Sequence, residues 1–377
     1  MTAAEILREL VAIPTPSAVS NLPLIEWVAK FVQTRGWRAE VLPYADDHGV
    51  PKANLIARPS STSPQDRIDL AFVCHTDTVP FAASWADALE LRAEPHSNGQ
   101  FLHGCGSCDV KGSLACFLAA IDATDPQAIQ PGIAIILTAD EEIGCKGMDC
   151  LLAQTNLSIR SAIVSEPTSL RPGIAGKGYG LARITVRGAQ AHSAFPAEGR
   201  SAILAAADLI LRIQQLETTR TQTPDALFDP PRTTINIGTI HGGSAKNIIA
   251  GECSFLVEWR PTPNDPPQEL LHALQSLAAA TQAADPRIRI LVEPLRAEPG
   301  FAPSSSGPLR KRLQDIVPRS ATGISFGSEA TRIARIAEEV IVIGPGDMHT
   351  AHSDRECVPE QELNEWTEIL RALITAP

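Results

Sequence analysis

A histidine and an aspartate two residues apart follow a strongly apolar run near residue 70. The sequence reads Cys74, His75, Thr76 and Asp77 directly after the run 68–73. In parallel sheets ligands bind at the carboxyl ends of the strands, so we expect these side chains at such an edge. Imidazole can hold a metal ion while a nearby carboxylate fixes its orientation. On its own, however, the pair is more typical of a buried structural histidine.

Further carboxylates follow the next apolar runs. Asp109 is the only acid of the glycine-rich loop 104–112, where it could bridge two cations or serve as an ordinary helix cap. Three adjacent acids at 140–142 follow the apolar run 132–137. If they are buried, a metal ion would offset their repulsion, whereas on a surface they would form a solvated turn. Glu166 stands at the end of another apolar run.

Two late histidines complete the set of possible metal ligands. His349 and His352 follow the Gly-Pro-Gly turn at 344–346. Histidine and carboxylate donors without a thiolate suit zinc. Two zinc ions with one shared carboxylate require about four or five side chains. Each motif is weak alone, but together they predict a site for two zinc ions.

The apolar patterns around these motifs predict an α/β domain. Helical patterns at 4–13 and 22–35 end at proline or glycine, and strand-like and helical segments then alternate. This alternation predicts a layered domain with a mostly parallel sheet. The expected strands are 54–57, 68–74, 133–139 and 162–164, with helices at 112–121 and 147–152.

The pattern changes after a glycine-rich link at 173–180. The following segments read strand, helix, strand, strand, helix, strand, which predicts a four-stranded antiparallel sheet backed by two helices. We therefore expect a layered α/β domain formed by 1–174 and 293–377, with a compact ferredoxin-like α+β unit inserted at 175–292.

Composition excludes several classes of protein. Hydrophobic residues make up 44% and charged residues 20%, as in ordinary globular proteins. A net charge of −11 without a basic cluster argues against nucleic acid and anionic membranes as partners. Because no apolar run is long enough to span a bilayer and no signal peptide is recognisable, we expect a cytoplasmic protein. The eight cysteines are scattered, so we expect no disulfide framework, and we discount the redox spacing of Cys105 and Cys108.

Five short strings in a fixed order carry a family resemblance. They are H-T-D-T-V-P, G-S-C-D-V-K-G, D-E-E-I-G, S-E-P-T and A-H-S-D-R-E. Together they resemble the co-catalytic zinc deacylases and exopeptidases, a family that includes acetylornithine deacetylase, succinyl-diaminopimelate desuccinylase and aminoacylase. The resemblance covers nearly the whole chain and implies two Zn²⁺ ions, with Co²⁺ as a substitute.

The resemblance also implies a role for each metal ligand. His75 and Glu166 would bind one zinc ion, and Glu142 and His352 would bind the other. Asp109 would bridge the two ions. The family therefore assigns one residue from each of the five strings to the metal centre.

Three further residues would act on the reaction without binding metal. In the family pattern, Asp77 orients the ligand His75, and Glu141 carries a proton from water to the leaving amine. The resemblance places His192 in the active site of a partner subunit, where it stabilises the oxyanion. The resemblance thus implies a three-layer αβα catalytic domain and a homodimer formed through an inserted lid or dimerisation domain. The alternative for His192 is a local turn or cap residue.

Four residues match the family's substrate-binding positions, namely Asn247, Arg260, Ser328 and Glu329. Arg260 suits an α-carboxylate because guanidinium binds such a group bidentately, although a surface ion pair is the alternative. The order Ser-Glu-Ala at 328–330 resembles the Thr-Glu-Ala of acetylornithine deacetylases and departs from the Ser-Asp-Gly of desuccinylases. Glu329 could then pair with the side-chain ammonium of ornithine.

The favoured function is therefore the hydrolysis of N2-acetyl-L-ornithine to ornithine and acetate, a step of arginine biosynthesis. Other N-acyl amino acids remain open as substrates, since a desuccinylase, an acetylcitrulline deacetylase, a general aminoacylase or a dipeptidase would share the same motifs. A non-catalytic binding protein on this fold is a distant alternative, because every ligand and the base are present.

Overall fold

A computed structural model describes residues 1–63, 66–97, 99–220, 223–304 and 307–375. The chain divides into two units, and the second unit interrupts the first along the sequence. The first unit consists of 1–174, 303–322 and 328–377, and the second of 175–302 and 323–327.

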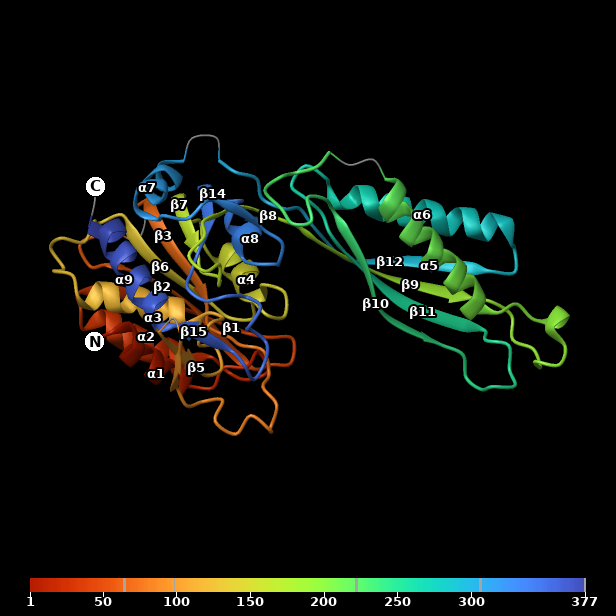
Figure 1. Ribbon diagram of the computed structural model, residues 1–377, viewed down its shortest axis with the longest axis horizontal. Helices are drawn as coiled ribbons and strands as arrows, with labels where there is room; N and C mark the ends of the chain where they lie inside the picture. The colour runs from red at the N-terminus through yellow and green to blue at the C-terminus, as the bar shows by residue number, and fades with distance from the viewer. Residues whose placement is uncertain (64–65, 98, 221–222, 305–306, 376–377) are drawn as a thin grey trace. The chain divides into compact units, whose positions relative to one another are not determined.

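An eight-stranded sheet forms the middle of the first unit, in the order β1-β2-β6-β3-β7-β14-β8-β13 (Figure 1). The central strands β6, β3, β7 and β14 are parallel, whereas β1, β2 and β8 pair antiparallel with their neighbours. The sheet is thus parallel only at its centre, whereas the sequence had predicted a mostly parallel sheet. The strands are β1 (Trp37–Ala45), β2 (Pro51–Pro59), β3 (Ile68–His75), β6 (Ile133–Thr138), β7 (Ile159–Val164), β8 (Gly173–Gly176), β13 (Thr322–Ile324) and β14 (Ala337–Val342).

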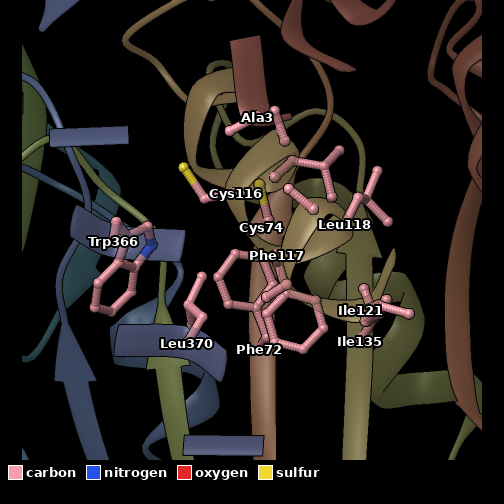
Figure 2. Close-up of a cluster of buried hydrophobic side chains, with 14 of the residues drawn as sticks. Ala3, Phe72, Cys74, Cys116, Phe117, Leu118, Ile121, Ile135, Trp366 and Leu370 are labelled. Atoms are coloured by element: carbon pink, nitrogen blue, oxygen red, sulfur yellow. The ribbon is translucent and has the colours of Figure 1, made fainter. Parts of the chain in front are cut away.

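Helices cover both faces of this sheet, which confirms the three-layer αβα architecture. On one face Phe72 of β3 stacks on Phe117 of α3, with ring centroids 4.3 Å apart (Figure 2). On the other face, the side chain of Asn54 in β2 donates to the main-chain oxygen of Gly147 in α4. The helices are α1 (Ala3–Val11), α2 (Leu22–Gln33), α3 (Lys111–Asp122), α4 (Lys146–Gln154), α7 (Pro308–Ile316), α8 (Ala330–Ile333) and α9 (Glu360–Thr375).

The first two helices show why local sequence specifies their ends. Thr2 and Glu5 form a reciprocal capping box at the start of α1, which satisfies two free backbone N–H groups. Gly36, just beyond α2, adopts a left-handed conformation with φ of 80°, as expected for a glycine that ends a helix. The positions of both helices are therefore predictable from the sequence.

A separate three-stranded sheet, in the order β15-β5-β4, was not anticipated. Its strands are β4 (Arg92–His96), β5 (Gly99–His103) and β15 (Cys357–Pro359). All of β4 is exposed, so it lacks the apolar alternation that reveals a half-buried strand. Strand β5 leads directly into the loop that contains Asp109.

The second unit has the predicted order of elements and forms a four-stranded antiparallel sheet, β10-β11-β9-β12. Two helices, α5 and α6, pack on this sheet, and Trp259 is buried in the core between them. Gly180 lies so close to Trp259 that a Cβ atom added at position 180 would be 1.9 Å from the indole ring. This is a ferredoxin-like α+β fold. Its elements are β9 (Tyr179–Arg187), the 3₁₀ turn Pro196–Glu198, α5 (Ala202–Thr219), β10 (Thr234–Gly242), β11 (Glu252–Arg260), α6 (Pro267–Ala284) and β12 (Arg289–Glu298).

Two expectations about the chain as a whole can be compared with the structure. All eight cysteines are free thiols, which agrees with the absence of a disulfide framework. In the described part of the chain, no helix has both the length and the apolar character needed to cross a membrane.

Candidate metal centre

His75 stands at the end of β3 with one ring nitrogen already engaged. Its Nδ1 donates to the main-chain oxygen of Asp77 at 3.0 Å. This bond fixes the tautomer in which Nε2 carries a lone pair. Nε2 lies 3.1 Å from Oδ1 of Asp109. The ring is therefore oriented as a metal ligand facing the Asp109 carboxylate.

Asp109 lies between two histidines that come from opposite ends of the chain. Its Oδ1 faces His75, and its Oδ2 lies 3.2 Å from Nε2 of His352. Burial tends to raise the pKa of Asp109, but its interactions with His352 and His75 outweigh this effect and lower the pKa well below its usual range. A carboxylate whose two oxygens face two different imidazoles is arranged to bridge two cations.

His352 also approaches a second carboxylate. Its Nε2 is 3.1 Å from Oε1 of Glu142, and hydrogen bonds to Asp109 and Glu142 raise the pKa of His352 to about 10. Ligand atoms of His75, Asp109 and Glu142 all lie within 4.8 Å of one another. The spacing of these donors fits a metal ion.

Glu166, at the end of β7, adds a further buried carboxyl to this cluster. Burial, together with the charges of Asp109 and Glu141, raises the pKa of Glu166 well above its ordinary value. Such crowding of acids is costly unless positive charge compensates it. The structure thus gathers the five predicted ligands, and their nitrogen and oxygen donors fit two divalent ions of the zinc type.

Glu141 precedes the ligand Glu142 in the turn after β6. Burial raises the pKa of Glu141 to about 8, the charge of His75 opposes this shift, and the charge of Glu142 adds to it. A carboxyl group with a pKa near neutrality can both accept and release a proton under working conditions. This environment matches the role of proton carrier.

The Asp77 carboxylate holds the turn that carries these two glutamates. It accepts hydrogen bonds from the backbone N–H groups of Glu141 and Glu142, at 3.1 and 3.3 Å, and from the Ser17 hydroxyl at 2.7 Å. Its Oδ1 is 3.7 Å from Nδ1 of His75, farther than the main-chain oxygen of Asp77. Asp77 therefore connects the two strand ends that supply the ligands.

Sequence reasoning missed the partner of the first acid in the 140–142 cluster. Asp140 is fully buried, and its Oδ1 lies 2.9 Å from Nζ of Lys52, which is also buried. Tyr44 donates its hydroxyl to the other oxygen of Asp140 at 2.8 Å. One of the three adjacent acids is thus neutralised by a lysine, which leaves the other two for the site.

Glu356 was also missed, although it ends the string that contains His352. Its carboxylate accepts hydrogen bonds of 3.0 Å from the backbone N–H groups of Gly106, Cys108 and Asp109. Burial raises the pKa of Glu356 to about 7. The sequence showed only that Glu356 is close to His352, and it gave no sign that Glu356 supports the loop that carries Asp109.

Ser328 and Glu329 belong to the first unit and are both buried. Glu329 accepts a hydrogen bond from the Thr138 hydroxyl at 2.6 Å, and Thr138 pairs with His75 in the sheet. Burial raises the pKa of Glu329 to about 7. The hydroxyl of Ser328 accepts from the backbone N–H of Ala330 at the start of α8. Glu329 thus lies beneath the strand ends that carry the candidate metal ligands.

The remaining candidates lie at opposite ends of the second unit. His192 forms an isolated β-bridge with Ile248, and the backbone N–H of Ser193 donates to the main-chain oxygen of Asn247 at 3.0 Å. His192 and Asn247 are therefore neighbours. Arg260 is the last residue of β11, where its guanidinium lies 4.3 Å from the Tyr179 ring centroid.

Comparison with known proteins agrees with this fold. Residues 174–286 match the peptidase dimerisation domain of the M20 family. The chain is similar to acetylornithine deacetylase of Myxococcus xanthus, with 38% identity over 95% of this chain and 92% of that protein. The fold resembles a Staphylococcus aureus tripeptidase, with a TM-score of 0.78, 23% identity and coverage of 99% and 97%. It also resembles a dinuclear metal-binding M20 peptidase of Bacillus subtilis, with a TM-score of 0.68, 12% identity and coverage of 99% and 98%.

The layered fold, its inserted unit and the cluster of histidines and carboxylates define a metal-dependent amidohydrolase. The chain belongs to the M20 family, which includes the acetylornithine deacetylases.

Proposed function

We propose that the protein uses two Zn²⁺ ions to hydrolyse the amide bond of N2-acetyl-L-ornithine, releasing acetate and ornithine. The observation that carries this proposal is the position of Asp109 between His75 and His352, with Glu141 beside them. When bound, paired zinc ions supply Lewis-acid activation of the carbonyl and of a water molecule. His75, Asp109 and Glu166 would hold one ion, and the other ion would share Asp109 with two further ligands, Glu142 and His352.

Glu141 performs the proton transfers of the reaction. It accepts a proton from the attacking water and then donates that proton to the nitrogen of the leaving amine. Because its pKa is raised to about 8, the carboxylate is a stronger base than an ordinary glutamate and its acid form still releases the proton. Asp77 holds the backbone of Glu141 in place for both steps.

Two observations support ornithine as the amine product. The relative with 38% identity is named acetylornithine deacetylase and is matched along nearly its whole length. In addition, Glu329 places a carboxyl group beneath the strand ends, where it could attract a substrate ammonium. Arg260 would bind the α-carboxylate of the substrate, and Ser328 would shape the wall of the site.

The first unit forms the catalytic domain, and the second unit, 175–302 with 323–327, serves as a lid and a dimerisation domain. Its helix α5 exposes Leu204 and Leu211, with 67% and 64% of their surface accessible, and the edge strand β10 exposes Ile240. Apolar side chains of this size on a helix and an edge strand are typical of an interface between subunits.

His192 then acts in the active site of the partner subunit, where it stabilises the oxyanion, and Asn247 beside it binds the substrate. The loops that carry these two residues lie next to the Glu252 end of β11. For example, the backbone N–H of Gly188 donates a hydrogen bond to the main-chain oxygen of Gly251. Arg260 is at the other end of β11, about 27 Å away at ~3.4 Å per residue. One small substrate cannot touch both ends from a single chain, so two chains would have to contribute.

A substrate panel on protein reconstituted with Zn²⁺ or Co²⁺ tests the proposed activity. We expect kcat/KM to be highest for N2-acetylornithine among acetylcitrulline, other acetylated amino acids, succinyl-diaminopimelate and dipeptides. The Glu141→Gln variant provides the blank. Preference for a succinylated substrate would replace the acetylornithine assignment with a desuccinylase, and no hydrolysis of any compound would overturn the proposal of an amidohydrolase.

A further inference from the structure

A second group of metal-binding side chains lies on the β4–β5 hairpin. Glu94 and His96 belong to β4, and His103 belongs to β5. In the ladder, His103 is opposite Arg92 and Glu94 is opposite Phe101. Alternate residues of a strand share a face, so the three side chains project from the same face of the hairpin.

The spacing of their ligand atoms approaches that of a zinc site. One donor atom from each of Glu94, His96 and His103 lies within 4.8 Å of the other two, and Nε2 of His103 is 3.5 Å from Oε2 of Glu94. Donors around a tetrahedral zinc ion, with bonds of about 2.0–2.2 Å, are about 3.4 Å apart. One pair therefore has this separation already, and exposed His96 needs only a small rotation to join it.

The state of His103 is an independent sign that a ligand belongs here. Its Nε2 is buried and makes no hydrogen bond of normal geometry within the described residues, its contact with Glu94 being 3.5 Å long. Buried ring nitrogens are normally hydrogen-bonded, so a nitrogen with only this long contact needs an explanation. The ring of His96 lies nearly parallel to that of His103, with centroids 6.4 Å apart, and it also contacts Phe101 at 4.5 Å. The aromatic contact with Phe101 holds His96 on this face.

We propose that Glu94, His96 and His103 bind one divalent transition-metal ion of the zinc type, in addition to the ions of the catalytic centre. Two imidazoles and one carboxylate are a common ligand set for zinc, and the exposed side of the hairpin leaves a coordination position for water. The ion would join β4 to β5 where β5 enters the loop that carries Asp109.

Metal stoichiometry of the full-length protein tests this site. After equilibrium dialysis against Zn²⁺, we expect wild-type protein to hold one more ion per chain than His96→Ala or Glu94→Gln. His241→Ala, which removes an exposed histidine from β10, is the matched control and should retain the wild-type number. Equal zinc content in wild type, His96→Ala and Glu94→Gln would overturn the proposal.

A variant that lacks the catalytic ligands separates this site from the catalytic centre. His75→Ala/Asp109→Ala should still bind one Zn²⁺ or Co²⁺ ion, and adding His96→Ala should weaken that binding about tenfold or more. Identical binding curves with and without His96→Ala would contradict the proposal even if the enzyme had no activity. Thermal unfolding of every variant checks that the fold is retained. Loss of metal from the catalytic centre alone would leave the hairpin site filled. The proposed function and the proposed hairpin site can therefore be rejected by different results.

Discussion

The carboxylate of Asp77, just beyond β3, accepts a hydrogen bond of 3.1 Å from the backbone N–H of Glu141 in the turn after β6. A side chain just beyond β3 thus fixes the main chain just beyond β6, the neighbouring strand in the sheet. Because Glu141 and Glu142 are adjacent, the same carboxylate positions both the proposed proton carrier and a proposed metal ligand.

Asp77→Asn should lower kcat by about 10- to 100-fold and weaken metal binding by a similar factor. The amide keeps one acceptor oxygen but turns an NH₂ group toward a backbone N–H that needs an acceptor. Enzyme kinetics and metal titration measure the two effects. Ser17→Ala removes only one donor to Asp77 and should have a smaller effect. Unchanged kcat and metal affinity in Asp77→Asn would contradict the positioning role.

Glu141→Gln should reduce kcat by about 10²–10⁴-fold while the metal content stays the same. The amide retains the shape of the side chain but cannot accept the proton. Its neighbour provides the matched comparison, since Glu142→Gln should lose metal as well as activity. Both quantities are measured on one preparation. A Glu141→Gln variant with wild-type kcat would remove this residue from the mechanism.

Glu356→Gln should lower the free energy of unfolding by about 1–3 kcal/mol. One oxygen of Glu356 accepts from Cys108 and Asp109, and the other accepts from Gly106, so an amide must leave a buried N–H group unpaired. Urea denaturation measures the change. Glu368→Gln, at an exposed position on α9, is the control and should have little effect. Equal stability of both variants would show that the loop does not depend on Glu356.

Mixed dimers test whether His192 acts in trans. His192→Ala and Glu141→Gln should each be nearly inactive, but refolding an equimolar mixture should restore about a quarter of wild-type activity. Half of the dimers would then be mixed, and each would contain one site with both groups intact. Sedimentation confirms the oligomeric state. Activity that stays at the level of the separate variants would exclude the partner's His192 from the reaction.

The ion pair between Glu365 and Arg319 should make part of the stability depend on pH. The bidentate contact with Arg319 lowers the pKa of Glu365, so its contribution is present above the unfolded pKa of about 4.3 and is lost as pH falls through the folded value. Glu365→Gln should cost about 1 kcal/mol at neutral pH and progressively less below pH 4. Denaturation at several pH values measures the difference in free energy of unfolding between wild type and Glu365→Gln. A difference that grows as the pH falls would contradict the prediction.

Much of the fold was predictable because its signals are local. Apolar periodicity indicated β3, β6 and β7 in the first unit and the βαββαβ order of the second. The strand β4 escaped because all of its residues are exposed, and β15 escaped because three residues are too few to show a period. The antiparallel pairing of β2 with β6 also had no sequence signal, since strand direction depends on the path of the chain between strands.

The sequence by itself determined which residue types stand at the strand ends, because each acid or histidine there follows its own apolar run. Only the tertiary structure decided how their charges are matched. The bond from Asp109 to Glu356 joins residues 247 positions apart, and the contact between Glu142 and His352 spans 210. Lys52, which neutralises Asp140, is equally without a local signal. Such pairs form only when folding brings distant segments together in a buried site, where an unpaired charge is too costly to remain.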